Sequence, residues 1–191
     1  MREDSKVFVA ESKVQSRTFS EDISKLAVEA KTDPVAFGQL YDHYVQLVYR
    51  YICSRVGSVF EAEDITSQTF MAVYESLPRY RERGYFSAWL FRIARSKINE
   101  HYRRSKREVE IEAAREILDR EDALGILIQA EELNRIRFLI SNLKNKEQEL
   151  ICLRYVAGLS FAEIADLVGK REDAVKKSIY RLLARLKCQM E

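Results

Sequence analysis

The side chains best suited to specific chemistry lie near the C-terminal end of the sequence, on a segment that also carries a regular apolar stripe. The spacing of Val175, Ile179 and Leu182 predicts a helix with one buried face. The residues on its other face are Lys176, Lys177, Tyr180 and Arg181. Lysine and arginine can donate hydrogen bonds to phosphates or to guanine edges, and tyrosine can contact bases or phosphates. This face is therefore a candidate nucleic-acid surface, and the alternative is the solvated face of an ordinary helical hairpin.

A short helix before this segment is marked at both of its ends. Ser160 can cap the first turn, Glu163 three residues later completes a capping box, and Gly169 suits the tight turn that follows. A short helix, a glycine turn and a basic helix make a helix-turn-helix, whose second helix enters the major groove of DNA. Further candidates for contacts with the same DNA are Arg154, Phe161 and Arg171.

A second concentration of basic residues lies in the middle of the chain. Residues 79–107 carry ten basic and two acidic groups, a net charge of +8, whereas residues 108–132 carry two basic and nine acidic groups, a net charge of −7. Residues 170–187 carry seven basic and two acidic groups, a net charge of +5. Because aromatic residues are interleaved with the arginines of the first block, that block could bind a phosphate backbone and stack on unpaired bases.

The elements that must position these residues are all predicted to be helices. Only 6 glycines and 2 prolines occur in the chain, and the alternating pattern of a strand is missing. Asp33 followed by Pro34 is a typical helix start. Besides the helix-turn-helix, apolar periodicity predicts helices over residues 34–55, 61–77, 86–105, 130–143 and 146–155.

We therefore expect an all-α fold with two small helical domains joined by a charged linker. Residues 1–20 show no apolar period, so residues 1–30 are predicted to be a mobile leader. The N-terminal domain is placed at 31–106 and the C-terminal domain, with the helix-turn-helix, at 131–191. Residues 107–130 between them are too polar to form a core and are interpreted as an acidic linker, helical in part.

Several classes of function find no support in the residues. No apolar run approaches the roughly 18–20 residues of a membrane span, and the first twenty residues do not resemble a secretory signal, so we expect a soluble, cytoplasmic protein without membrane insertion. Cys53 and Cys152 are interpreted as small core residues, and His43 and His101 as surface or interface residues. No catalytic residue, metal ligand or cofactor is predicted.

Both halves of the chain contain motifs that resemble those of sigma factors of the extracytoplasmic-function class. These are compact members of the sigma-70 family with only the second and fourth conserved regions. The resemblance covers about residues 35–106 and 131–187. The matching stretches are Ala-Glu-Asp-Ile at 62–65, Gln-Thr-Phe at 68–70, Phe-Ser-Ala-Trp-Leu-Phe-Arg-Ile-Ala-Arg at 86–95, and residues 150–155, 158–165 and 174–176.

The resemblance implies a non-catalytic subunit that directs RNA polymerase to promoters, and it implies a role for each set of residues. The helix with Asp64, Gln68 and Thr69 would dock on the clamp helices of the largest subunit of core RNA polymerase. The −35 element would be read by Arg154, Phe161, Arg171, Lys176, Lys177, Tyr180 and Arg181. The −10 element, as duplex and as melted non-template strand, would be held by Arg79, Tyr80, Arg81, Arg83, Trp89, Arg92, Arg95, Ser96, Asn99, Arg103 and Arg104.

Some interpretations stay open beside the resemblance. Trp89 is also a candidate core residue, and the linker is either a segment that threads into polymerase or a solvated spacer. Ser96 stands where the family often has asparagine, and the charged residues 170–174 replace the usual start of the recognition helix, so we expect a different promoter preference. An inhibitory anti-sigma factor is a further implied partner.

Two other function classes compete with this one. The first is a free-standing regulator that binds operators as a dimer, with the N-terminal half as a sensor, although a sensor has no need of the +8 block at 79–107. The second is an enzyme with an appended DNA-binding domain, for which no site constellation is present.

Overall fold

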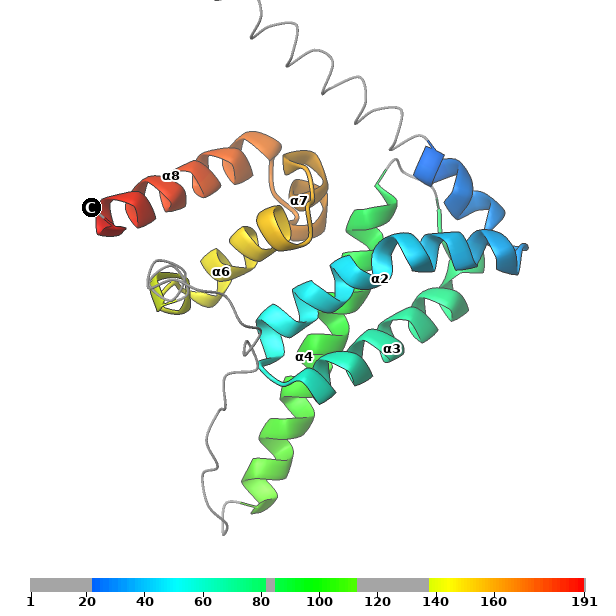
Figure 1. Ribbon diagram of the computed structural model, residues 1–191, viewed down its shortest axis with the longest axis horizontal. Coiled ribbons are helices and arrows are strands. Elements are labelled where there is room, and N and C mark those ends of the chain that lie inside the picture. Colours follow the sequence, from blue (N-terminus) through cyan, green and yellow to red (C-terminus); the bar gives the residue numbers. More distant parts are fainter. Residues whose placement is uncertain (1–21, 82–84, 113–137, 191) are drawn as a thin grey trace, which may run out of the picture.

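The computed structural model describes residues 22–81, 85–112 and 138–190, and every regular element within these ranges is helical (Figure 1). The predicted all-α fold is confirmed. The two longest helices lie in the N-terminal half, and the helix-turn-helix lies in the C-terminal half.

Helices α2 (Pro34–Val56) and α3 (Val59–Ser76) run in opposite directions across a two-residue connection (Figure 1). The predicted start of α2 is confirmed, since the Asp33 carboxylate accepts a hydrogen bond from the Val35 N–H at 2.8 Å. At its end, Gly57 has a φ of 76°, a left-handed conformation that favours glycine. Helix α3 begins two residues earlier than predicted because the Ser58 hydroxyl accepts a hydrogen bond from the Glu61 N–H at 3.4 Å and caps the helix there.

Helix α4 (Phe86–Glu112) lies across α2 and α3 and carries the middle basic block. Its predicted buried face is confirmed, because Leu90, Ala94 and Ile98 are all buried. Its predicted end at residue 105 is wrong, and the helix continues into the segment interpreted as an acidic linker. Glutamate, lysine and arginine are good helix formers, so high charge alone did not indicate a break. The rest of that predicted linker lies outside the described residues.

The N-terminal domain begins earlier than the sequence indicates. Residues 22–29 form a helix, although the prediction assigns them to a mobile leader. Ile23, Ala27 and Ala30 are buried in the same core as α2 and α4. These three small or branched apolar residues lie among charged ones, and their helical spacing alone was too weak a signal to predict a helix there. Residues 1–21 of the predicted leader lie outside the described residues.

The C-terminal half contains α6 (Asn145–Ile151), a wider π-helical turn η2 (Cys152–Val156), α7 (Phe161–Val168) and α8 (Glu172–Met190). The predicted helix over 146–155 is therefore present, with a change of helical type that periodicity does not indicate. Of the helix predicted over 130–143, the described part is helical at residues 138–141.

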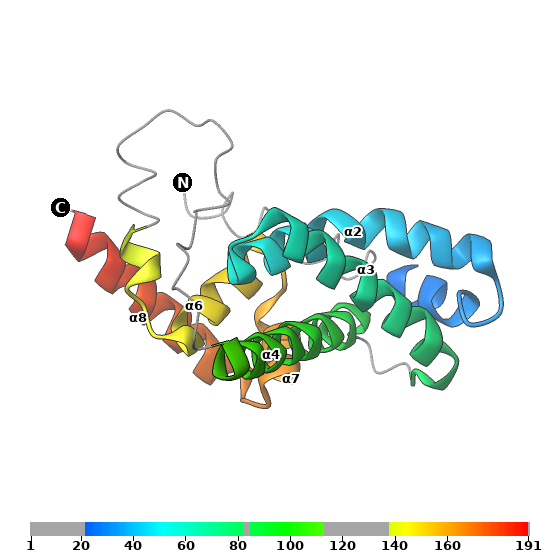
Figure 2. The same ribbon diagram turned by 90° about the horizontal axis from the view of Figure 1, so that it is seen from below.

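The two halves pack against each other, with α7 beside α4 and η2 beside α2 (Figures 1 and 2). Their buried residues belong to one continuous apolar cluster. The predicted organisation contained two helical domains and a linker, but no contact between the domains.

Candidate nucleic-acid interface

The helix-turn-helix is held by the local contacts that the sequence predicts. The Glu163 N–H donates to the Ser160 hydroxyl at 3.2 Å, and the Ser160 N–H donates to the Glu163 carboxylate at 2.7 Å. Gly169 ends α7 with a φ of 67°. The capping box and the glycine turn are thus confirmed, and they fix the angle at which α8 leaves α7.

Helix α8 separates its apolar and basic residues as predicted. Val175, Ile179 and Leu182 are buried against α6 and α7. Lys176, Lys177, Tyr180 and Arg181 are exposed, and in the described ranges none of the three cations forms an ion pair. Cationic donors on the open face of a second helix are available for phosphates and base edges.

Two of the other residues predicted to contact the upstream DNA also stabilise the fold. The Arg154 guanidinium donates to the Leu159 carbonyl at 2.8 Å and lies 4.6 Å from the centre of the Phe161 ring. Phe161 in turn lies 5.9 Å from the Tyr180 ring. Arg154 therefore holds the loop before α7, and the aromatic pair connects α7 to the exposed face of α8. Arg171 is exposed at the turn between the two helices.

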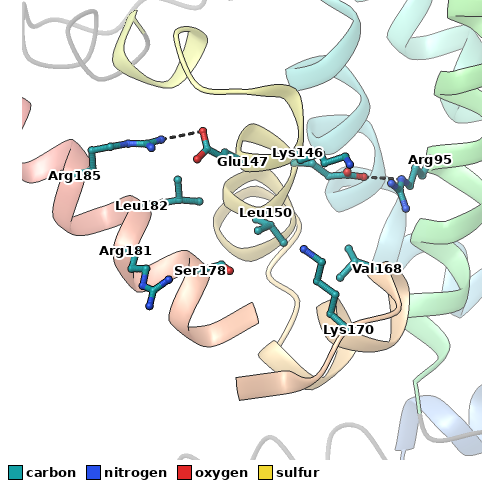
Figure 3. A pocket seen from close by; sticks show the side chains of 11 residues that line it. Arg95, Lys146, Glu147, Leu150, Val168, Lys170, Ser178, Arg181, Leu182 and Arg185 are labelled. Atoms are coloured by element: carbon teal, nitrogen blue, oxygen red, sulfur yellow. Dashed lines mark hydrogen bonds and ion pairs between the residues drawn. The ribbon is translucent and has the colours of Figure 1, made fainter. Parts of the chain in front are cut away.

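A cavity of about 590 Å³ opens between α4, α6 and α8 (Figure 3). Arg95 of α4 and Arg181 of α8 both line it, together with Lys170. On its α8 side, Arg185 pairs with Glu147 at 2.9 Å, and this hydrogen bond lowers the pKa of the Glu147 carboxyl. A residue predicted to bind the −10 element and one predicted to bind the −35 element thus lie at the same cavity.

The solvent-facing side of α4 carries four of the residues predicted to bind the −10 element. Ser96, Asn99, Arg103 and Arg104 are exposed. Arg104 donates to Glu100 one turn earlier at 2.8 Å, a local contact on the same helix. These residues form a polar, cationic strip that could follow a nucleic-acid backbone.

Two arginines of α4 have partners in the C-terminal half that the sequence did not predict. Arg92 pairs with the Asp166 carboxylate at 3.0 Å and also donates to the Asp166 carbonyl at 3.1 Å. Arg95 pairs with Glu149 of α6 at 2.7 Å. Their contact with the −10 element stays a prediction, and the structure adds these ion pairs, which join residues more than fifty positions apart and have no signal in the sequence.

Tyr80 and Trp89, also predicted to contact the −10 element, belong to an aromatic cluster with Phe86. The Tyr80 ring lies 4.6 Å from that of Trp89 and 5.5 Å from that of Phe86. Tyr80 is only 6% exposed, so here its side chain is part of the core, and its contact with DNA stays a prediction. Its carbonyl accepts a hydrogen bond from the Lys31 ammonium at 2.7 Å. Trp89 is half-buried, which agrees with its alternative interpretation as a core residue.

The loop before α4 contributes cations near this cluster. Arg79 and Arg81 are exposed. Arg83, the third arginine predicted here, lies outside the described residues.

The residues predicted to dock on polymerase divide into two groups on α3. Asp64 is exposed, and its carboxylate accepts a hydrogen bond from the Gln68 amide at 2.7 Å. Thr69 is fully buried, and its hydroxyl donates to the Ile65 carbonyl at 2.7 Å. Thr69 lies one residue further along the helix than Gln68, which turns its side chain into the core, and its predicted contact with polymerase stays a prediction.

The described residues contain neither a cluster suited to a metal ion nor a helix suited to a membrane. Where residues are described, no three histidine, cysteine or acidic side chains gather closely enough to hold a metal ion. None of the described helices is long and apolar enough to cross a membrane. His101 lies 3.5 Å from Glu61, a contact between α4 and α3.

Comparisons with known proteins agree with the two-part organisation. Residues 40–108 match the family model for sigma-70 region 2, and residues 133–186 match that for sigma-70 region 4. The chain therefore belongs to the sigma-70 family, whose members direct RNA polymerase to promoters. Within that family it is one of the extracytoplasmic-function (ECF) sigma factors, as its relatives indicate.

Two relatives and one solved structure show the extent of the similarity. The ECF RNA polymerase sigma factor BldN of Streptomyces coelicolor is 38% identical over 160 residues, which cover 79% of this chain and 59% of BldN. SigD of Mycobacterium tuberculosis is 35% identical over 150 residues, covering 74% of this chain and 70% of SigD. The structure of CnrH in complex with the cytosolic domain of CnrY aligns with a TM-score of 0.64 at 25% identity, covering 87% of this chain and 96% of that chain.

Proposed function

We propose that the chain binds core RNA polymerase in the cytoplasm and directs it to promoters that have both a −35 and a −10 element. Helix α8 reads the −35 element in the major groove, while the exposed side of α4 holds the opened −10 element. The proposal assigns no catalytic step to the chain. The boundaries of the two functional domains are proposed as predicted, except that the N-terminal one includes the helix at residues 22–29 and the whole of α4 to Glu112.

The observation that carries the proposal is the presence of two cationic helical faces on one chain. The α8 face combines Lys176, Lys177 and Arg181 with an open surface. The α4 strip combines Asn99 and Arg103, and the half-buried Trp89 lies on the same helix. One face suits duplex DNA and the other a strand with unstacked bases. A regulator that binds only duplex operators needs the first face and not the second.

Docking on polymerase is proposed for the exposed part of α3. The Asp64 carboxylate and the Gln68 amide are linked by a hydrogen bond and form a polar patch that can meet a partner helix. The proposed partner surface is the clamp helices of the largest polymerase subunit.

A regulatory partner is also proposed. The solved structure of CnrH contains the cytosolic domain of CnrY, and its fold resembles that of this chain. We infer that an anti-sigma factor binds this chain in a comparable way.

The test is reconstitution with core RNA polymerase. We expect the purified chain to co-elute with core polymerase in gel filtration and to direct specific run-off transcripts from a genomic promoter library. A chain that fails to bind core polymerase but binds duplex DNA alone would instead be a free-standing regulator.

A further inference from the structure

We propose that the cavity between α4, α6 and α8 is a binding site for a small phosphorylated molecule of the nucleoside diphosphate class, and that this ligand withdraws Arg181 from promoter DNA. The binding site itself requires no assumption about the function of the chain. The consequence for promoter DNA rests on the proposed function, which assigns Arg181 to the −35 element.

The cavity has a strong excess of positive charge. Five of its eleven lining residues are cations and two are carboxylates, so its wall has a formal net charge of +3. The cations come from α4, α6, α8 and the turn before α8, and they are Arg95, Lys146, Lys170, Arg181 and Arg185. A cleft lined mainly by charges of one sign concentrates the electric field and attracts ions of the opposite sign. The cavity therefore favours an anionic ligand.

Both carboxylates of the cavity already have cationic partners. Glu149 lies 2.7 Å from Arg95, and Glu147 lies 2.9 Å from Arg185. The hydrogen bond from Arg185 lowers the pKa of the Glu147 carboxyl, so this group stays ionised near neutral pH. Each carboxylate thus offsets one arginine, and neither is available to neutralise the other cations of the cavity.

The three remaining cations are available for a ligand. Lys146, Lys170 and Arg181 form no ion pair within the part of the chain that the structure describes. Lys170 extends toward Leu150 at the centre of the lining (Figure 3). A terminal phosphate carries about −1.5 to −2 charge near pH 7, and a second phosphate adds about one more negative charge. Three unpaired cations therefore match a diphosphate group in charge.

Apolar side chains line the cavity beside the cations. Leu150 and Leu182 are buried, and Val168 is half-buried. The volume of about 590 Å³ is within the range of about 300–1,000 Å³ that is typical of small-ligand pockets, which combine apolar walls with a few charged groups. An organic group such as a nucleobase can contact these apolar side chains. A DNA duplex, whose major groove alone is about 12 Å wide, is too large for the cavity.

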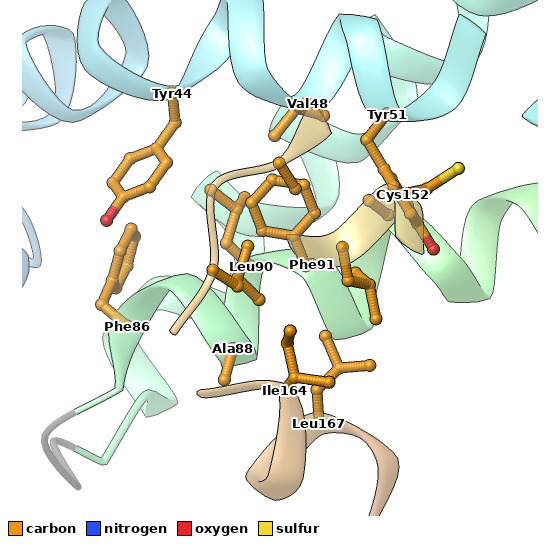
Figure 4. Packing of buried hydrophobic residues seen from close by; sticks show 14 of the residues in the cluster. Tyr44, Val48, Tyr51, Phe86, Ala88, Leu90, Phe91, Cys152, Ile164 and Leu167 are labelled. Atoms are coloured by element: carbon orange, nitrogen blue, oxygen red, sulfur yellow. The ribbon is translucent and has the colours of Figure 1, made fainter. Parts of the chain in front are cut away.

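The packing beneath the cavity holds its walls in place before a ligand binds. Phe91 of α4 and Ile164 of α7 are fully buried, and Leu167, next to Val168 in the lining, is buried as well (Figure 4). The ion pair of Arg95 with Glu149 connects α4 to α6 at the cavity itself. A site whose groups are already in place loses little conformational freedom when it binds, which favours affinity.

Arg181 gives the ligand an effect on promoter binding. The residue lines the cavity, and it also lies on the exposed face of α8 that is proposed to read the −35 element. A phosphate held by the Arg181 guanidinium competes with DNA for the same donors. Ligand binding and promoter binding therefore weaken each other by the same factor.

The first experiment measures ligand binding by isothermal titration calorimetry, with the full-length chain and ADP in a buffer that contains EDTA. We expect one ADP to bind per chain and inorganic pyrophosphate to compete with it. Adenosine, which lacks the phosphates, is expected not to bind. The double variant Lys146→Ala/Lys170→Ala removes two of the unpaired cations and should bind ADP at least tenfold more weakly than wild type. Both side chains are exposed, and circular dichroism checks that the fold is unchanged.

The matched control is the double variant Lys176→Ala/Lys177→Ala. It removes the same charge from the exposed face of α8, and neither residue lines the cavity. We expect its affinity for ADP to stay within twofold of wild type. This control separates a site in the cavity from general attraction of an anion to a basic helix.

The second experiment measures how tightly the chain and core polymerase together bind a labelled promoter fragment in a gel shift, without nucleoside triphosphates. Saturating ADP is expected to weaken promoter binding at least fivefold with wild type and less than twofold with Lys146→Ala/Lys170→Ala. Because the same core polymerase is present in both cases, the comparison cancels any direct effect of ADP on polymerase. Without ADP the two chains should bind alike, since neither lysine is proposed to contact DNA.

The outcomes separate the ligand site from the proposed function. Absence of binding by both ADP and pyrophosphate, or an equal loss of ADP affinity in the two double variants, would overturn the ligand site. A single-stranded oligonucleotide whose binding depends on Lys146 and Lys170, while ADP does not bind, would overturn it in favour of a strand-binding surface. Unchanged promoter binding in saturating ADP would overturn the effect through Arg181. A wild-type chain that binds ADP but directs no transcript would overturn the proposed function and leave the ligand site in place.

Discussion

The basic faces of α8 and α4 have similar residues but differ in what covers them. On α8, Lys176, Lys177 and Arg181 are exposed and have no ion-pair partner among the described residues. On α4, Arg92 and Arg95 are paired with carboxylates of the other half of the chain. A cationic helix face thus identifies a candidate DNA surface, while the accessibility of that face depends on the rest of the fold.

The largest expected effect concerns the core that both halves share. Phe91 is fully buried where α4 meets the C-terminal half. We expect Phe91→Ala to lower the free energy of unfolding by about 3–5 kcal/mol, as measured by urea denaturation. The control is Phe60→Ala, at a site that is 84% exposed, with an expected change within about 0.5 kcal/mol. A loss below about 1 kcal/mol at Phe91 would mean that the interface is not packed in solution.

The second-largest effect is expected at the polar patch of Asp64 and Gln68 on α3, which belongs to neither basic face. Asp64→Ala removes a carboxylate and its hydrogen bond to Gln68. If a charged hydrogen bond to polymerase is lost, core affinity should fall by about 1.5–3 kcal/mol, with DNA binding by the isolated chain unchanged. Fluorescence titration with core polymerase measures this, and Glu63→Ala on the same helix is the matched control. Equal affinities of the two variants would remove Asp64 from the docking surface.

The role of the open face of α8 in promoter binding can be tested by comparing Arg181, which lies on that face, with Arg185, which pairs with Glu147. Arg181→Ala should weaken promoter use by about 1–3 kcal/mol if one base contact is lost. Arg185→Ala, which removes the partner of Glu147, should have a much smaller effect on promoter use. Competitive run-off transcription gives both values. An Arg185 effect equal to that of Arg181 would show that the assignment of the open face is wrong.

A smaller effect is expected at the start of the helix-turn-helix. Ser160→Ala removes the oxygen that accepts from the Glu163 N–H and should lower the free energy of unfolding by about 1 kcal/mol. Thermal or urea unfolding measures the change. Ser67→Ala on exposed α3 has no capping role and should change stability by less than about 0.5 kcal/mol. Indistinguishable variants would show that the cap contributes nothing.

The smallest effect is expected from the exposed ion pair between Arg92 of α4 and Asp166 of α7. A double-mutant cycle with Arg92→Ala and Asp166→Ala should give a coupling energy of about 0.2–1 kcal/mol, since both side chains are about half exposed. The coupling should decrease in high salt, where screening weakens exposed pairs. A coupling energy of zero at low salt would show that the ion pair between the two side chains contributes nothing to this part of the interface.

The residues themselves were sufficient to predict much of this protein. Ser160, Glu163 and Gly169 predict the helix-turn-helix because caps and turns depend on groups only a few positions apart. The stripe of Val175, Ile179 and Leu182 predicts which side of α8 is open. The motifs of the two blocks were also sufficient to predict the family, which the matches to regions 2 and 4 confirm.

The accessibility of the candidate residues, in contrast, depends on how the helices pack. Helical periodicity separates an apolar face from a polar one, but it does not show what covers the polar face. Tyr80 and Thr69 are buried, and Arg92 meets Asp166 from 74 positions away, because helices that are distant in the sequence pack together. Such contacts depend on the whole arrangement of α4, α6 and α7, and no short segment of the chain contains them.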